Sequence, residues 1–172
     1  MSGRLSRLGF AATLAALLSF LPAGCGYRLG SSLPPGIRTV HVPTFINRTG
    51  EPQLEVETTR ATVQEFQKDG TLKVVKLGNE DAVLTVRLVS FELEPLRYER
   101  VDAKTTTEYR LKIVAEIGFK RTSNGQILIR RRVMGKSTFD PLGDLTSAKL
   151  DAVPAAARDL AHEIVKSVVE YW

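Results

Sequence analysis

Few residues of this sequence are placed to do chemistry. Glu92 and Glu94 lie two positions apart, on one face of an expected strand, where they could act as general acid and base. Such a pair is more often a solvated strand edge, and no nucleophile elbow, phosphate-binding loop or zinc-protease motif accompanies it. The only histidines, His41 and His162, are too far apart in the sequence to suggest a metal site. We therefore predict no enzyme activity, no cofactor and no metal.

The only cysteine, Cys25, ends a segment that has the order of an export signal. Arg4 and Arg7 give a basic start, residues 8–21 form an apolar run, and Ala23-Gly24 provides a small-residue cleavage site. The apolar run is shorter than the roughly 20 residues that a membrane-spanning helix needs. The alternatives are an uncleaved anchor helix and an ordinary signal with an incidental cysteine.

The position of Cys25 directly after Ala23-Gly24 resembles the lipobox of bacterial lipoproteins. One departure is that Pro22 stands where the lipobox usually has leucine. We predict that residues 1–24 are removed and that Cys25 is lipidated, because the three acyl chains of a bacterial lipoprotein exceed what stable anchoring requires. By resemblance to lipoprotein sorting, Gly26 favours the outer membrane, with the folded body facing the periplasm.

Basic residues give the chain a formal net charge of +5, or +3 once Arg4 and Arg7 are subtracted. Export argues against nucleic acid as the partner, and the abundant anion of the outer membrane is lipopolysaccharide, whose phosphates and carboxylates suit Arg and Lys. The alternative at each basic cluster is a solvated surface. The clusters comprise Arg97, Arg100 and Lys104; Arg130, Arg131 and Arg132, with Arg131 on the opposite strand face; and Lys149.

The first half of the exported chain predicts a tether, a strand and a helix. Residues 25–36 are rich in Gly, Ser and Pro, which favours an extended tether. Residues 37–43 alternate apolar and polar side chains, as in a strand. A helix is expected to run to about Lys68, with Thr49 as its cap and Pro52 in its first turn.

The second half predicts a set of strands joined by a tight turn. The clearest strand covers residues 106–120, where apolar and charged residues alternate strictly. Asn124-Gly125 is a strong hairpin signal, and a change of parity near Ser90 indicates a β-bulge. The other expected strands cover residues 72–77, 82–94 and 126–139.

An apolar stripe over residues 145–170 predicts a long C-terminal helix. Pro154 either kinks this helix or marks its true start, with Asp151 as cap. The order of elements becomes β-α-β-β-β-β-α. It predicts an α+β fold in two layers, a mostly antiparallel sheet of four to five strands with both helices on one face, formed by a single domain over residues 37–172.

Several of these segments together resemble the LptE family of lipopolysaccharide-assembly lipoproteins. The resemblance covers essentially the whole exported chain, in the same order. It rests on the start Ala23-Gly24-Cys25-Gly26-Tyr27-Arg28-Leu29, an Asn-x-Thr loop before Glu51-Pro52, the stretch Thr107-Glu108-Tyr109-Arg110-Leu111 and the long C-terminal helix.

The resemblance implies a non-catalytic subunit that plugs the LptD barrel, assists its assembly and binds lipopolysaccharide. The family's basic loop residue falls near Arg100, with Arg97 and Lys104 as neighbours, and its second basic position matches Lys149. The resemblance assigns no role to Arg130, Arg131 and Arg132. A generic periplasmic adaptor or inhibitor of another envelope complex is the alternative.

Overall fold

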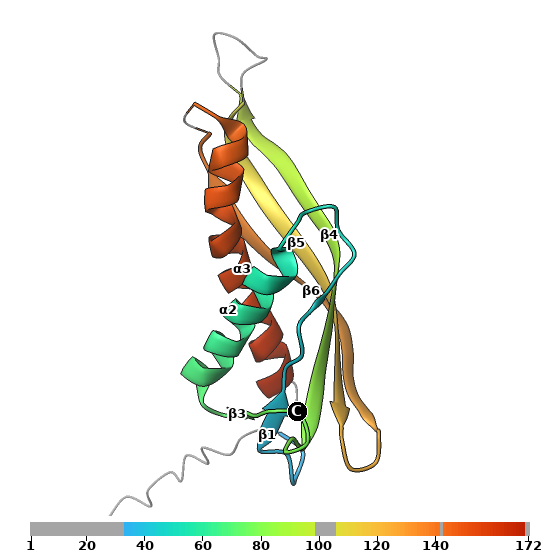
Figure 1. The fold of residues 1–172 in the computed structure, drawn as a ribbon. Coiled ribbons are helices and arrows are strands. Elements are labelled where there is room, and N and C mark those ends of the chain that lie inside the picture. The colour runs from blue at the N-terminus through green and yellow to red at the C-terminus, as the bar shows by residue number, and fades with distance from the viewer. Residues whose placement is uncertain (1–32, 99–105, 142, 171–172) are drawn as a thin grey trace, which may run out of the picture. The chain divides into compact units, whose positions relative to one another are not determined.

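The computed structural model describes residues 33–98, 106–141 and 143–170, with only the backbone described at residues 97, 98, 106 and 107. Two helices lie on one face of a sheet, so the predicted two-layer α+β fold is confirmed (Figure 1). The elements are β1 (Thr39–His41), β2 (Ile46–Asn47), α2 (Leu54–Asp69), β3 (Lys73–Val74), β4 (Ala82–Tyr98), β5 (Thr106–Arg121), β6 (Ile127–Phe139) and α3 (Leu145–Val169).

Strands β4, β5 and β6 pair in sequence order as long antiparallel neighbours and form most of the sheet. The alternation predicted for β5 is confirmed, because every second residue is buried against the helices. The hairpin at Asn124-Gly125 is also confirmed, with Gly125 at a positive φ of 70°. The buried residues of β5 are Leu111, Ile113, Ala115, Ile117 and Phe119.

The change of parity in β4 comes from a β-bulge, as predicted. Leu88 pairs with Ala115 and Ser90 with the adjacent Val114, so that one extra β4 residue is accommodated. Beyond the bulge, Phe91 packs against the buried core. The strand then continues past its predicted end to Tyr98. Pro95 fits within it because the described pairing at this level involves β5 alone.

The short strands lie at the other edge of the sheet and run parallel to their neighbours. β1 lies between β3 and β4, and β2 pairs separately with β4. Two of them are shorter than predicted, and β2 was not predicted. Asp81 fixes β1 through its carboxylate, which accepts the N–H groups of Arg38 and Thr39 and the Thr39 hydroxyl. These bonds lower the pKa of Asp81 below its ordinary value, with the Arg38 N–H as the largest cause.

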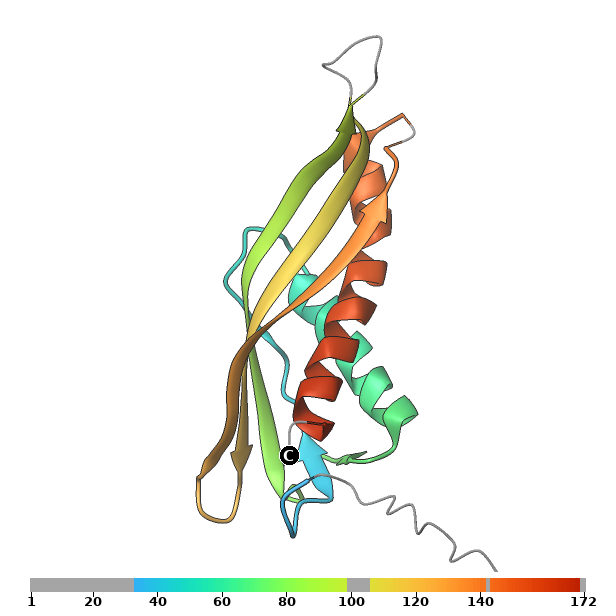
Figure 2. The same ribbon diagram turned by 180° about the vertical axis from the view of Figure 1, so that it is seen from behind.

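Helix α3 begins as predicted and lies directly on β6 (Figure 2). Asp144 caps it by accepting the N–H groups of Thr146 and Ser147, and the helix continues through Pro154. The alternative start with Asp151 as cap is therefore wrong, because Asp144 supplies the acceptor for the first turn.

Gly135 allows α3 to approach β6 closely. A Cβ atom at this position would lie 2.4 Å from the Leu160 nitrogen and 2.5 Å from the Ala156 oxygen. One residue further on, the Lys136 N–H donates to the Asp159 carboxylate of α3 at 2.8 Å. The helix thus both covers the core and bonds to the outward side of this edge strand.

Helix α2 packs beside α3 through small residues, namely Ala61 against Ala157 and Ala161. Its predicted start is wrong. The cap position is Gln53, which has a φ of 61° and no side-chain cap bond, while Pro52 precedes the helix. Thr49 instead bonds within the preceding loop, where its hydroxyl accepts the Glu51 N–H.

The export signal, Cys25 and most of the tether lie outside the described residues, so the boundaries expected at residues 24 and 36 stay predictions. Among the residues that the structure describes, no helix is long and apolar enough to cross a membrane.

Candidate anion-binding sites

Lys149, in the first turns of α3, is held on the core face of the sheet. Its ammonium nitrogen lies 2.9 Å from Glu51 Oε2 and 5.6 Å from the centre of the Phe91 ring. The side chains of Lys149 and Glu51 are only 26% and 13% exposed. This cation therefore joins α3 to the loop before α2 and to strand β4, through an ion pair and a cation–π contact.

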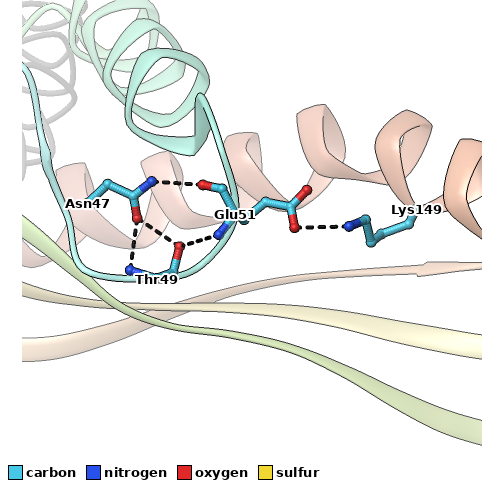
Figure 3. A network of polar contacts seen from close by, with 4 residues as sticks. All are labelled: Asn47, Thr49, Glu51 and Lys149. Atoms are coloured by element: carbon cyan, nitrogen blue, oxygen red, sulfur yellow. Dashed lines mark hydrogen bonds and ion pairs between the residues drawn. The ribbon is translucent and has the colours of Figure 1, made fainter.

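The loop that presents Glu51 is ordered by its own polar side chains (Figure 3). Asn47 Oδ1 accepts both the N–H and the hydroxyl of Thr49, and Asn47 Nδ2 donates to the Glu51 carbonyl at 2.8 Å. The same amide group donates to Glu55 in the first turn of α2. The Asn-x-Thr loop thus has a structural function, and it aims the Glu51 carboxylate at Lys149.

The other residues predicted for this site are only partly placed by the structure. Arg97 lies in the last part of β4, six residues beyond Phe91, which is about 20 Å along an extended strand. Arg100 and Lys104 lie outside the described residues. The side chain of Arg97 also lies outside what the structure describes, so the grouping of these residues with Lys149 stays a prediction.

The arginines of β6 divide between the two faces of the sheet, as alternation predicted. Arg131 lies toward α3, with its guanidinium 3.4 Å from the Ser167 hydroxyl. Arg132 is on the outer face and donates to Glu116 at 2.7 Å, and Arg87 contacts the same carboxylate at 3.5 Å. The Arg132 hydrogen bond is the largest cause holding the pKa of Glu116 below its ordinary value.

The outer face is hollowed beside these charges. An open hollow of about 720 Å³ lies over Gly118, with Thr85 and Arg130 on the flanking strands. We call it the Gly118 hollow. Sequence reasoning noted the arginines but missed the hollow. The available signal was a glycine inside an otherwise regular strand, which often marks a place where another group approaches the backbone.

The acidic pair and the histidines have ordinary structural partners. Glu94 forms an ion pair with Lys112 across the strands, and Glu92 accepts the Ser90 hydroxyl. His41 contacts the Val75 carbonyl at 3.1 Å, and His162 contacts Glu65 at 3.2 Å. Within the described ranges, no group of acidic, histidine or cysteine side chains could hold a metal ion.

A family model for LptE, described as lipopolysaccharide-assembly, matches residues 37–168. The chain belongs to the LptE family. It is thus a member of a non-enzymatic lipopolysaccharide-assembly lipoprotein family, and the predicted absence of enzyme activity is confirmed. The match covers all eight elements that the structure describes, apart from the last residue of α3. No curated protein matches the LptE-family chain significantly.

Solved structures with low sequence identity share the fold of this LptE-family chain. A hypothetical protein from Chlamydia trachomatis has a TM-score of 0.54 at 9% identity, covering 77% of this chain and 95% of that one. An uncharacterized lipoprotein B from Nitrosomonas europaea has a TM-score of 0.52 at 13% identity, covering 81% of this chain and 85% of that one. A putative lipoprotein from Caulobacter crescentus has a TM-score of 0.51 at 12% identity, covering 77% of this chain and 89% of that one. These likenesses concern the fold alone.

Proposed function

We propose that this chain is the lipid-anchored, non-catalytic subunit of a lipopolysaccharide translocon in the outer membrane. The observation that carries the proposal is the LptE family match over residues 37–168. The segment before it supports the location, since a basic start, an apolar run and Cys25 have the order of a lipoprotein signal. An adaptor or inhibitor of another envelope complex is less well supported, because the family is one of lipopolysaccharide assembly.

The anchor is tested by mass spectrometry of the intact protein recovered from membranes. Removal of residues 1–24 and acylation of Cys25 are expected. A Cys25→Ala variant serves as control, and it should keep its leader and lack the added mass. A wild-type chain with its leader attached, or with a bare thiol, contradicts the anchor.

The proposed partner is an LptD-like barrel, whose lumen the folded domain fills as a plug. The large barrels of the outer membrane enclose a polar interior, and the exposed side of α2 carries charged side chains, among them Arg60 and Lys68, that suit contact with it. Depletion of this chain should lower the amount of correctly assembled barrel, measured in outer-membrane fractions. Unchanged barrel assembly, with no barrel co-purified, contradicts this partner.

The proposed lipopolysaccharide contacts are Arg97, Arg100, Lys104 and Lys149. Lys149 approaches from the core face and is already paired with Glu51, so its substitution also changes packing. The double variant Arg100→Asp/Lys149→Asp should weaken lipopolysaccharide binding, with the larger loss at low salt, because the Debye length shortens to about 10 Å at 0.1 M. Binding is measured on the detergent-purified protein over a salt series.

A matched control separates the lost cation from the lost packing at this site. Glu51→Gln removes the partner of Lys149 but keeps the cation. It should leave lipopolysaccharide binding intact even where it lowers stability. Equal loss of binding in Glu51→Gln and in the double variant indicates a packing effect, and unchanged binding in the double variant leaves only the plug role.

A further inference from the structure

The Gly118 hollow is built by three neighbouring rows of the outer sheet face. The central row is Thr85, Gly118 and Arg130, which pair directly across β4, β5 and β6. Arg87, Glu116 and Arg132 form the next row in one direction. Lys120 lies two residues beyond Gly118 in the other direction. The one position without a side chain is therefore surrounded by side chains on every side.

The backbone does not require glycine at residue 118. Gly118 does not have a positive φ, and a Cβ placed there would meet nothing closer than the Thr85 carbonyl oxygen at 4.0 Å. A side chain would therefore fit the strand without strain, and its effect would be to fill the hollow. Gly135 in the next strand shows the opposite case, since its missing Cβ is needed for packing against α3.

The charges around the hollow are strongly unbalanced. Arg87, Arg130 and Arg132 carry three positive charges against the one negative charge of Glu116, a net of +2, while the Lys120 ammonium lies beside Gly125 in the hairpin turn. Glu116 is shared by Arg87 and Arg132. Arg130, which is exposed, forms no ion pair with any other residue that the structure describes. The guanidinium-bearing residues Arg87, Arg130 and Arg132 line the same hollow, and such groups suit the geometry of a phosphate.

We propose that the Gly118 hollow is a binding site for a phosphorylated sugar. The phosphate group lies over the bare backbone of Gly118, within reach of Arg130 and its basic neighbours. The Glu116 carboxylate and the Thr85 hydroxyl accept hydrogen bonds from the sugar hydroxyls. A hollow of about 720 Å³ has room for a sugar ring as well as the phosphate.

This site is separate from the lipopolysaccharide contacts of the proposed function. Lys149 lies on the core face of the sheet, whereas the Gly118 hollow opens on the other face. The hollow is also twelve residues along β4 from Arg97, about 40 Å in an extended strand. A variant that loses binding at one site can therefore keep binding at the other, and the two proposals can fail independently.

An acidic protein segment fits the hollow less well than a phosphorylated sugar. A segment added along the sheet would lie over a regular row of side chains. Here Gly118 interrupts that row and leaves a hollow beside the arginines. An acidic peptide is nevertheless included among the probes, so that the experiment decides between the two.

The test is an NMR titration of the full-length protein in detergent, following the amides of Thr85, Gly118 and Arg130. The probes are a hexose 1-phosphate, the unphosphorylated hexose, inorganic phosphate and a glutamate-rich peptide. We expect saturable shifts with the hexose 1-phosphate, weaker binding of inorganic phosphate and no shifts with the hexose. The loss of one charge-assisted contact in Arg130→Ala should raise Kd about tenfold.

Two further variants separate binding from folding. Gly118→Val fills the hollow without backbone strain and should abolish the shifts while keeping the melting temperature. Lys136→Ala removes an exposed cation from the same strand outside the hollow and should bind as the wild type does. Any one of three outcomes overturns the proposal. These are stronger binding of the acidic peptide than of the hexose 1-phosphate, equal binding of inorganic phosphate and hexose 1-phosphate, and unchanged binding of the hexose 1-phosphate by Gly118→Val. Lipopolysaccharide binding by the same variants reports separately on the proposed function.

Discussion

The two faces of the sheet use the same residue types for different purposes. On the core face, Gly135 admits the backbone of α3 and Lys149 joins three segments through Glu51 and Phe91. On the outer face, Gly118 leaves open space and Arg130 has no ion-pair partner among the described residues. A glycine or a cation thus has a structural function where another element covers it, and is available to a ligand where none does.

Substitution of the two glycines, Gly135 and Gly118, should give the largest difference in stability between the two faces. Gly135→Ala should destabilise the domain by about 3 kcal/mol, because its Cβ would overlap backbone atoms of α3 that cannot move independently. Gly118→Ala should change stability by no more than about 0.5 kcal/mol, since its Cβ meets open space. Denaturant unfolding of both variants measures the difference, and equal stabilities contradict it.

The two cations provide the next contrast. Lys149→Ala should cost about 2 kcal/mol, because it leaves the largely buried Glu51 carboxylate without its partner. Arg130→Ala should stay within about 0.5 kcal/mol of the wild type. A double-mutant cycle with Glu51→Gln isolates the ion pair. A coupling energy near zero would show that Lys149 contributes through Phe91 and packing rather than through Glu51.

Asp144 at the start of α3 provides a smaller, pH-dependent contrast. Hydrogen bonding to Ser147, first through its hydroxyl, lowers the pKa of this carboxyl below its ordinary value of 3.8. The stabilisation is thus fully present above pH 3.8 and is lost as the pH falls through the lower folded-state pKa. Asp144→Ala should lower the melting temperature at pH 7, and the gap to wild type should narrow below pH 3.8.

Thermal melts of the wild type and Asp144→Ala at a series of pH values check this prediction. Asp151→Ala is the matched control, since it removes a carboxylate from the same helix that does not cap its first turn. A gap that stays constant with pH would show that residue 144 does not act through its ionised carboxylate.

Local patterns predicted the long elements well, because their signals lie within the elements themselves. The alternation in β5, the parity change at the β4 bulge and the Asn124-Gly125 turn all appear as expected. The start of α2 was missed because Gln53 is held by the surrounding fold rather than by a capping side chain. The shortness of β1 and β3 and their parallel pairing also depend on contacts distant in sequence.

In the candidate sites too, local patterns predicted some features, whereas others depend on contacts distant in sequence. Arg131 and its neighbours were placed on the correct faces, since strand alternation alone decides this. The pairing of Lys149 with Glu51 joins residues 98 positions apart, and no spacing rule predicts it. The Gly118 hollow needs three strands in register before it exists, so the sequence showed its cations without showing the space between them.

The hydrogen bond from Lys136 to Asp159 also bears on how this chain avoids aggregation. A long strand at the border of a sheet offers its free amides to other copies and can seed aggregates. Helix α3 occupies one of these amides, and the repelling arginines at residues 130 and 132 flank the stretch that remains. Both features disfavour pairing of this strand with the same strand of a second copy.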